Sequence, residues 1–155
     1  MKTALQPQDY LQVLSSLVGL NSQFLVSAFD LAAIDNPDAA AQMLRASRDA
    51  GAMTLMDSGN YESFWKDAQG NWAQTNFHKI LGAYSCDLAF GFDEQHPPKD
   101  FGQHVALMVS LWREDQAAAG SCLIVPIIHG SAAELPTLCA AVAAQTGVVM
   151  MAVAE

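Results

Sequence analysis

The sequence predicts an α/β protein with a parallel sheet of about five strands. Five short apolar runs, at residues 24–29, 53–56, 88–92, 123–128 and 148–153, have the length and composition of buried strands. Segments with helical spacing lie between them, at residues 36–50, 75–84, 99–119 and 131–146, and one more lies before them, at residues 8–18. Because strands and helices alternate, the sheet is expected to be parallel with right-handed crossovers.

Local signals support the boundaries of these helices. Asn36 is a good cap, Pro37 suits the first helical position, and Gly51 is a natural stop. Ser131 and Glu134 have the spacing of a capping box, which predicts that a helix begins there.

Two architectures fit this order of elements. A five-stranded doubly wound sheet is the default for a complete domain of this size. The other is the first part of a (β/α)8 barrel, which normally needs ~250 residues. In both cases residues 1–155 form a single domain, and periodicity alone does not separate the two.

Composition limits the partners of the chain. It has 155 residues, of which 52% are hydrophobic and 15% charged, whereas about 25% charged is usual for a soluble domain. The low charge predicts that some apolar surface is covered by another molecule. The net charge of −9 repels phosphate backbones, so this segment alone is a poor nucleic-acid binder.

Cys86, Cys122 and Cys139 are far apart in the sequence and form no zinc-binding pattern. An odd number of scattered cysteines fits a reducing cytoplasm, where they are expected to be buried structural thiols. No segment resembles a signal peptide, and no apolar run approaches the ~20 residues of a membrane span. We therefore expect a cytoplasmic protein with no membrane partner, no metal and no cofactor.

Each apolar run ends at or near an ionisable residue. The five residues in question are Asp30, Asp57, Asp93, His129 and Glu155. Chemistry in parallel α/β folds sits at the carboxyl ends of the strands, so these groups are predicted to converge on one rim. At Asp57 the strand runs into Ser58 and Gly59, which favour a turn, so the acid could also be a simple turn cap.

Three of these strand ends resemble the tRNA-guanine transglycosylases, the family that inserts queuine or archaeosine precursors into tRNA. Residues 55–62, Leu-Met-Asp-Ser-Gly-Asn-Tyr-Glu, resemble the family's Asp-Ser-Gly-Gly-Phe-Gln motif. Residues 86–98 are similar to its strand ending in Phe-Asp-Glu before a proline-containing loop. Residues 124–130 are similar to its Gly-Ile-Val-Gln-Gly segment, and the resemblance covers roughly residues 24–155.

The resemblance implies a partial (β/α)8 barrel of about five βα units that holds a purine base. It implies that Asp57 is a catalytic acid/base group. It implies that Asp93 reads the edge of the base, that Tyr61 stacks on its face, and that Ser58, His129 and Gly130 contact it. The substrate would be guanine or a 7-deazaguanine, and the larger partner tRNA, reached through a missing C-terminal half or another subunit. DNA is an open variant.

The sequence departs from the family pattern at four site positions. Asn60 replaces glycine, Tyr61 phenylalanine, Glu62 glutamine and His129 glutamine. The family's nucleophilic aspartate and zinc segment lie on later parts of the chain, which are absent here, so the chain is expected to be incomplete for catalysis alone. The alternative is a non-catalytic subunit or remnant that binds a partner.

The strands at residues 24–29 and 148–153 would be the open edges of an incomplete barrel. Open edges and apolar faces promote association. The sequence therefore predicts self-association, or the need for a missing half, rather than a well-behaved monomer.

Overall fold

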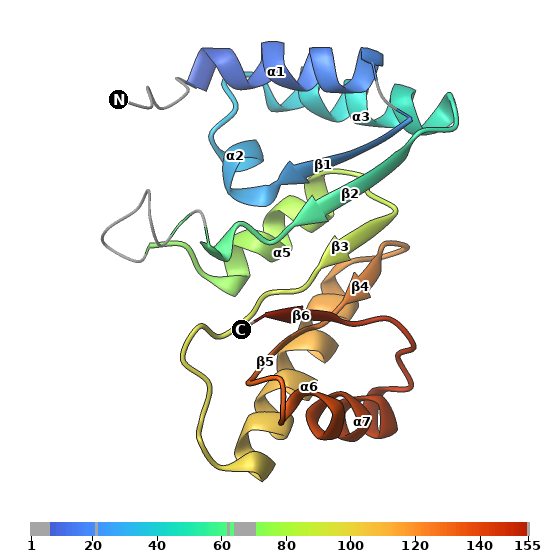
Figure 1. Cartoon of the computed structure of the whole chain (residues 1–155). Coiled ribbons are helices and arrows are strands. Elements are labelled where there is room, and N and C mark those ends of the chain that lie inside the picture. The colour runs from blue at the N-terminus through green and yellow to red at the C-terminus, as the bar shows by residue number, and fades with distance from the viewer. Residues whose placement is uncertain (1–6, 21, 62, 64–70, 155) are drawn as a thin grey trace.

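The computed structural model describes residues 7–20, 22–61, 63 and 71–154. Helices and strands alternate along them (Figure 1). The elements are α1 (Pro7–Leu20), β1 (Gln23–Ser27), α2 (Ala28–Ala32), α3 (Pro37–Asp49), β2 (Met53–Asp57), α5 (Gln74–Ala83), β3 (Leu88–Phe90), α6 (Phe101–Ala118), β4 (Leu123–Val125), β5 (Ile127–His129), α7 (Leu135–Thr146) and β6 (Ala152–Ala154). The α/β class predicted from the sequence is confirmed.

The main sheet has four strands in the order β1-β2-β3-β4, all parallel. Strands β5 and β6 form a second parallel pair. Pro126 separates β4 from β5, because proline has no backbone N–H to offer a neighbouring strand. Its carbonyl still accepts a hydrogen bond from the N–H of Ala152, at 3.0 Å. The described strands follow one another in chain order, without the reversal of a doubly wound sheet.

Three predicted strands are shorter than their apolar runs, and the predicted strand at residues 123–128 is divided into β4 and β5. The first ends at Ser27, and the run continues as the short helix α2. The strand predicted at residues 88–92 ends at Phe90. The last is a strand only over Ala152–Ala154, and Val149, which was expected within it, is fully exposed. Apolar composition does not distinguish a strand from a buried helix, and a strand also requires a paired neighbour. Glu155, expected at the rim, lies outside the described residues.

Side chains cap the N-termini of two of the described helices, α3 and α6. The side chain of Asn36 accepts a hydrogen bond from the N–H of Ala39 at 3.1 Å, and Pro37 is the first residue of α3, as predicted. The predicted start of α7 at Ser131 is wrong. Residues 131–134 form a turn, closed by the bond from the N–H of Glu134 to the carbonyl of Ser131 at 2.9 Å, and the helix begins at Leu135.

The main core lies between one face of the sheet and the helices, of which α5 and α6 lie behind the strands in Figure 1. Five strand side chains belong to it: Phe24, Val26, Met56, Ala89 and Ile124. A second core joins α6, β5 and α7 around Ile128. None of the helices in the described part of the chain has the length and apolar character needed to cross a bilayer.

The opposite face of the sheet carries a row of leucines. The strand register aligns Leu25, Leu55, Leu88 and Leu123, one from each strand, and we call them the leucine row. Because side chains alternate along a strand, this row points away from the main core. Leu25 and Leu123 are 52% and 50% exposed, so the two ends of the row are open to solvent.

Candidate functional site

An open cavity of about 750 Å³ lies at the carboxyl ends of the strands. Its size is in the range of ligand-binding sites. Its lining includes Tyr61, Asp93, His129 and Gly130, four of the six site residues predicted from the sequence. They come from the segments after β2 and β3 and from the end of β5, so the parallel strands bring together residues that are far apart in the chain.

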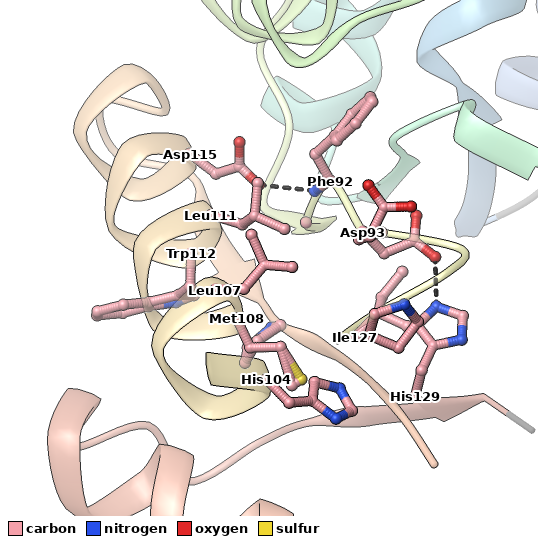
Figure 2. A pocket seen from close by; sticks show the side chains of 14 residues that line it. Phe92, Asp93, His104, Leu107, Met108, Leu111, Trp112, Asp115, Ile127 and His129 are labelled. Atoms are coloured by element: carbon pink, nitrogen blue, oxygen red, sulfur yellow. Dashed lines mark hydrogen bonds and ion pairs between the residues drawn. The ribbon is translucent and has the colours of Figure 1, made fainter. Parts of the chain in front are cut away.

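The polar centre of this cavity is the pair Asp93 and His129. Nε2 of His129 lies 2.6 Å from Oδ2 of Asp93, and the two side chains are 21% and 10% exposed (Figure 2). Asn60 holds the same aspartate from the segment after β2. Its Nδ2 donates to Oδ1 of Asp93 at 3.0 Å and to the backbone oxygen of Asp93 at 2.7 Å. Both carboxylate oxygens are therefore fixed before any ligand arrives.

A fully buried carboxylate supports the segment that carries Asp93. Asp115 of α6 has no exposed surface, and its Oδ2 accepts a hydrogen bond from the N–H of Phe92 at 2.6 Å (Figure 2). Its Oδ1 accepts from Nε2 of Gln74 at 2.9 Å and lies 2.8 Å from Nε2 of His78, both in α5. Burial raises the pKa of the Asp115 carboxyl, whereas the bonds from Gln74, Phe92 and His78 lower it.

The position of Asp115 also explains why residue 91, two residues before Asp93, is a glycine. A Cβ placed on Gly91 would lie 3.0 Å from Oδ2 of Asp115, so a larger residue would push this carboxylate away from Phe92. The strand end Phe-Gly-Phe-Asp thus depends on a glycine for the close approach of α6 to the backbone that carries Asp93.

Asp57 and Ser58 are not among the residues that line the cavity. Oδ1 of Asp57 accepts a hydrogen bond from the N–H of Gly59 at 2.8 Å, which closes the turn after β2. Ser58 is 2% exposed, and its carbonyl accepts a bond from Nε1 of Trp72 at 3.0 Å. The expected grouping of Asp57 with Asp93 and His129 around one cavity is therefore not what the fold produces.

His104 of α6 lies beside His129 at the edge of a smaller cavity of about 10 Å³ (Figure 2). The residue is 8% exposed, and its Nε2 is buried without a hydrogen-bond partner among the described residues. Burial lowers the pKa of His104, and the neighbouring His129 lowers it further, while Glu134 acts in the opposite direction.

The lowered pKa of His104 predicts sensitivity to acid. The folded protein keeps this residue neutral where the unfolded chain takes up a proton. Its contribution to stability is therefore present above the unfolded pKa of about 6.5 and is lost as the pH falls through the lower folded pKa. Between about pH 7.5 and about pH 5.5, the wild type should lose more free energy of unfolding in urea than His104→Gln.

The control for this comparison is His96→Gln, because His96 is exposed. It should lose as much stability as the wild type over the same interval. If His104→Gln shows the same loss as the wild type, the acid sensitivity lies in other groups.

Sequence reasoning missed the residues that hold the site in place. Asp115 had a detectable signal, since it follows Met108 and Trp112 at helical spacing and so lies on the buried face of its helix. A charged residue on a buried face must be paired with other polar groups. This rule would have identified Asp115 as part of a buried polar network. His78 and Gln74 carry no comparable signal, because only the packing of α5 against α6 brings them to Asp115.

The sequence matches no protein-family model, and no significant match was found among curated proteins. No three His, Cys, Asp or Glu side chains in the described ranges are grouped so that they could hold a metal ion. A function must therefore be inferred from the residues of the rim cavity themselves.

Proposed function

We propose that the rim cavity binds a purine base, guanine or a 7-deazaguanine, and that the chain is the base-binding part of a transglycosylase-like protein linked to tRNA modification. The observation that carries this proposal is the fixed pair of Asp93 and His129 in an open cavity with Tyr61. The resemblance of residues 55–62, 86–98 and 124–130 to the tRNA-guanine transglycosylases supports the same choice of ligand.

Asp93 has the chemistry to recognise the edge of guanine. That edge presents a ring N–H and an amino group side by side, and one carboxylate can accept a hydrogen bond from each. A carboxylate offers about four lone-pair sites, of which Asn60 and His129 occupy two. The remaining sites leave Asp93 able to pair with a base in the cavity it lines.

Tyr61 and the segment at His129 supply the other contacts that a base needs. Tyr61 is 63% exposed at the cavity, and stacking of an aromatic ring on a base is worth ~1–3 kcal/mol. The partner of Nε2 of His129 is Asp93, so Nδ1 is the ring nitrogen that remains for a ligand. Gly130 lines the cavity directly after it.

The fold we propose for this function is a partial (β/α)8 barrel. Three findings support it: the parallel strands follow chain order, the main core lies on one face of the sheet, and the leucine row occupies the other face. The inner face of such a barrel would carry the leucine row, and its rim would carry Asp93 and His129.

Calorimetry with guanine tests the proposal. The wild type should bind guanine, and Asp93→Ala should weaken binding by at least about tenfold, because each hydrogen bond to a charged group is worth about 1.5–3 kcal/mol. Adenine should bind weakly to both proteins, since its ring nitrogen is an acceptor that repels a carboxylate.

The matched control is Asp49→Ala, which removes an exposed acid at the end of α3, far from the cavity lining. It should leave guanine affinity unchanged. Equal guanine affinity in the wild type and in Asp93→Ala would refute the role of Asp93, and no binding by either would refute the purine site.

Binding rather than exchange is the activity that this geometry supports best. Asp57, expected as the catalytic acid/base, is engaged with Gly59 and does not line the cavity. Exchange at an anomeric carbon needs a carboxylate nucleophile and a proton donor. Incorporation of labelled guanine into tRNA by the isolated chain would show that it is a complete enzyme and would refute the non-catalytic alternative.

The leucine row, which is exposed at its two ends, favours a second function, binding of a partner or of another copy of the chain. Leu25 and Leu123 lie half exposed at the two ends of the row, and Val149 and Met150 are exposed next to β6. Apolar surface of this kind usually belongs to an interface. The edges of β1 and β6 add unpaired backbone groups that another strand can use.

We therefore expect the chain to self-associate through the leucine row and these edges. In sedimentation velocity, the apparent mass should rise with concentration, and Leu25→Gln with Leu123→Gln should shift the protein toward monomer. Leu20→Gln is the control, because Leu20 is 83% exposed on α1 and lies outside the row. A monomer at every concentration would contradict the open-face interpretation.

A further inference from the structure

Two cysteines meet at the end of the molecule opposite the rim cavity. Cys86 lies two residues before β3 and Cys122 lies directly before β4, and these two strands are parallel neighbours. Their Sγ atoms are 2.8 Å apart, and both are free thiols. A disulfide has a sulfur–sulfur distance of about 2.05 Å, so bond formation requires a movement of only about 0.8 Å.

The thiol pair has its own access route. A cavity of about 330 Å³ is lined by both cysteines together with Arg45, Arg48 and Tyr84, and it shares no lining residue with the rim cavity. The cysteines form its floor, since they are only 3% and 4% exposed. This geometry admits a small reagent and excludes a bulky one.

The two sulfurs are chemically unequal. The hydrogen bond with Cys86 lowers the pKa of the Cys122 thiol, although burial and Asp87 act in the opposite direction. The same bond raises the pKa of Cys86, as does burial, and only Arg48 opposes this. Either sulfur can be the hydrogen-bond donor in this pair, and the opposite directions of the two pKa shifts make Cys122 the sulfur that loses its proton more readily. Thiolates, not thiols, react with oxidants.

We propose that Cys86 and Cys122 form a reversible redox pair, which hydrogen peroxide or a similarly small hydroperoxide oxidises to an intramolecular disulfide. The Cys122 thiolate attacks one peroxide oxygen, the O–O bond breaks, and hydroxide leaves, which gives a sulfenic acid at Cys122. The Cys86 sulfur then attacks the Cys122 sulfur, the S–O bond breaks, and water leaves with the Cys86 proton. In total, two thiols lose two electrons and one hydrogen peroxide is reduced to two waters.

The disulfide ties together the part of the chain that carries the purine site. Residues 86–122 include β3, Asp93 and α6 with Asp115, and the bond closes them into one loop. A cross-link over a loop of this length restricts the unfolded chain and should raise the Tm by about 10 °C. Cys139 lies in α7, outside the loop of residues 86–122, and is not expected to join the disulfide.

Peptide mapping after oxidation tests the pair directly. The fully reduced chain is treated with one equivalent of hydrogen peroxide, its free thiols are alkylated in denaturant so that buried thiols also react, and it is digested without reductant. The expected product has lost two hydrogens in mass, contains a linked peptide pair with Cys86 and Cys122, and carries the alkyl group only on Cys139. Dithiothreitol should restore three alkylatable thiols.

Two variants sharpen the result. Cys139→Ser should form the same link as the wild type, whereas Cys86→Ser should stop at a sulfenic acid on Cys122 that dimedone captures. Three results for the wild type would each overturn the proposal: a disulfide through Cys139, a dimer linked between chains, or three free thiols after treatment. Peptide mapping of the wild type tests the proposal without any substitution, so the test remains valid even if a variant folds poorly.

Discussion

Asp115→Ala should destabilise the protein by about 3–5 kcal/mol of unfolding free energy. The carboxylate is fully buried and satisfies three groups at once: the N–H of Phe92, Nε2 of Gln74 and Nε2 of His78. Truncation removes three hydrogen bonds to a charged acceptor, each worth about 1.5–3 kcal/mol. Gln74 keeps its bond to the carbonyl of Leu111 at 3.2 Å, and His78 is 24% exposed and can turn to solvent, so the loss is smaller than the sum of the three. Urea unfolding followed by circular dichroism measures the loss.

Glu114→Ala is the matched control, because it removes the neighbouring acid of the same helix. Oε1 of Glu114 accepts a bond from Oγ of Ser110 at 3.1 Å on the exposed face of α6, where such contacts contribute little. This variant should lose less than about 1 kcal/mol. Equal losses in the two variants would mean that the buried network does not hold α5 and α6 to the strand end before Asp93.

The secondary structure was predictable wherever local chemistry decides it. Asn36 and Pro37 start α3, and Gly147 ends α7 with a φ of 75°, the left-handed conformation that glycine adopts without strain. The first apolar run was extended too far, because Ala28 begins α2 rather than continuing β1. The end of a strand depends on which neighbouring strand it pairs with, and the pattern of apolar residues in one sequence does not show that.

The rim cavity was predictable in part, for a related reason. Asp93 and His129 follow parallel strands, so their meeting could be inferred from the order of the elements. Asp57 also follows a strand, but position does not determine what its side chain binds, and the turn at Gly59 competes for it. The contacts of Asp115 with α5 depend on how α5 and α6 pack against each other on one side of the sheet.

Gly59→Ala is the second substitution for which we expect a large loss, about 2–5 kcal/mol of unfolding free energy. A Cβ at this position would lie 2.5 Å from Cβ and 2.6 Å from the backbone nitrogen of Phe29, so α2 and the turn could not keep their present contact. Overpacking of this kind costs about 1–3 kcal/mol. The φ of 76° adds about 1–2 kcal/mol for any residue other than glycine.

Gly147→Ala separates these two causes. Gly147 has nearly the same φ, 75°, but a Cβ there would meet no atom within 4 Å, so this variant should lose only the conformational part, about 1–2 kcal/mol. Gly59→Ala should also weaken guanine binding, because Asn60, which holds Asp93 through two hydrogen bonds, directly follows Gly59. Equal losses of stability in the two variants would show that α2 yields to the added methyl group. In that case Gly59 is needed only for the positive φ of the turn, and its contact with Phe29 does not require a glycine.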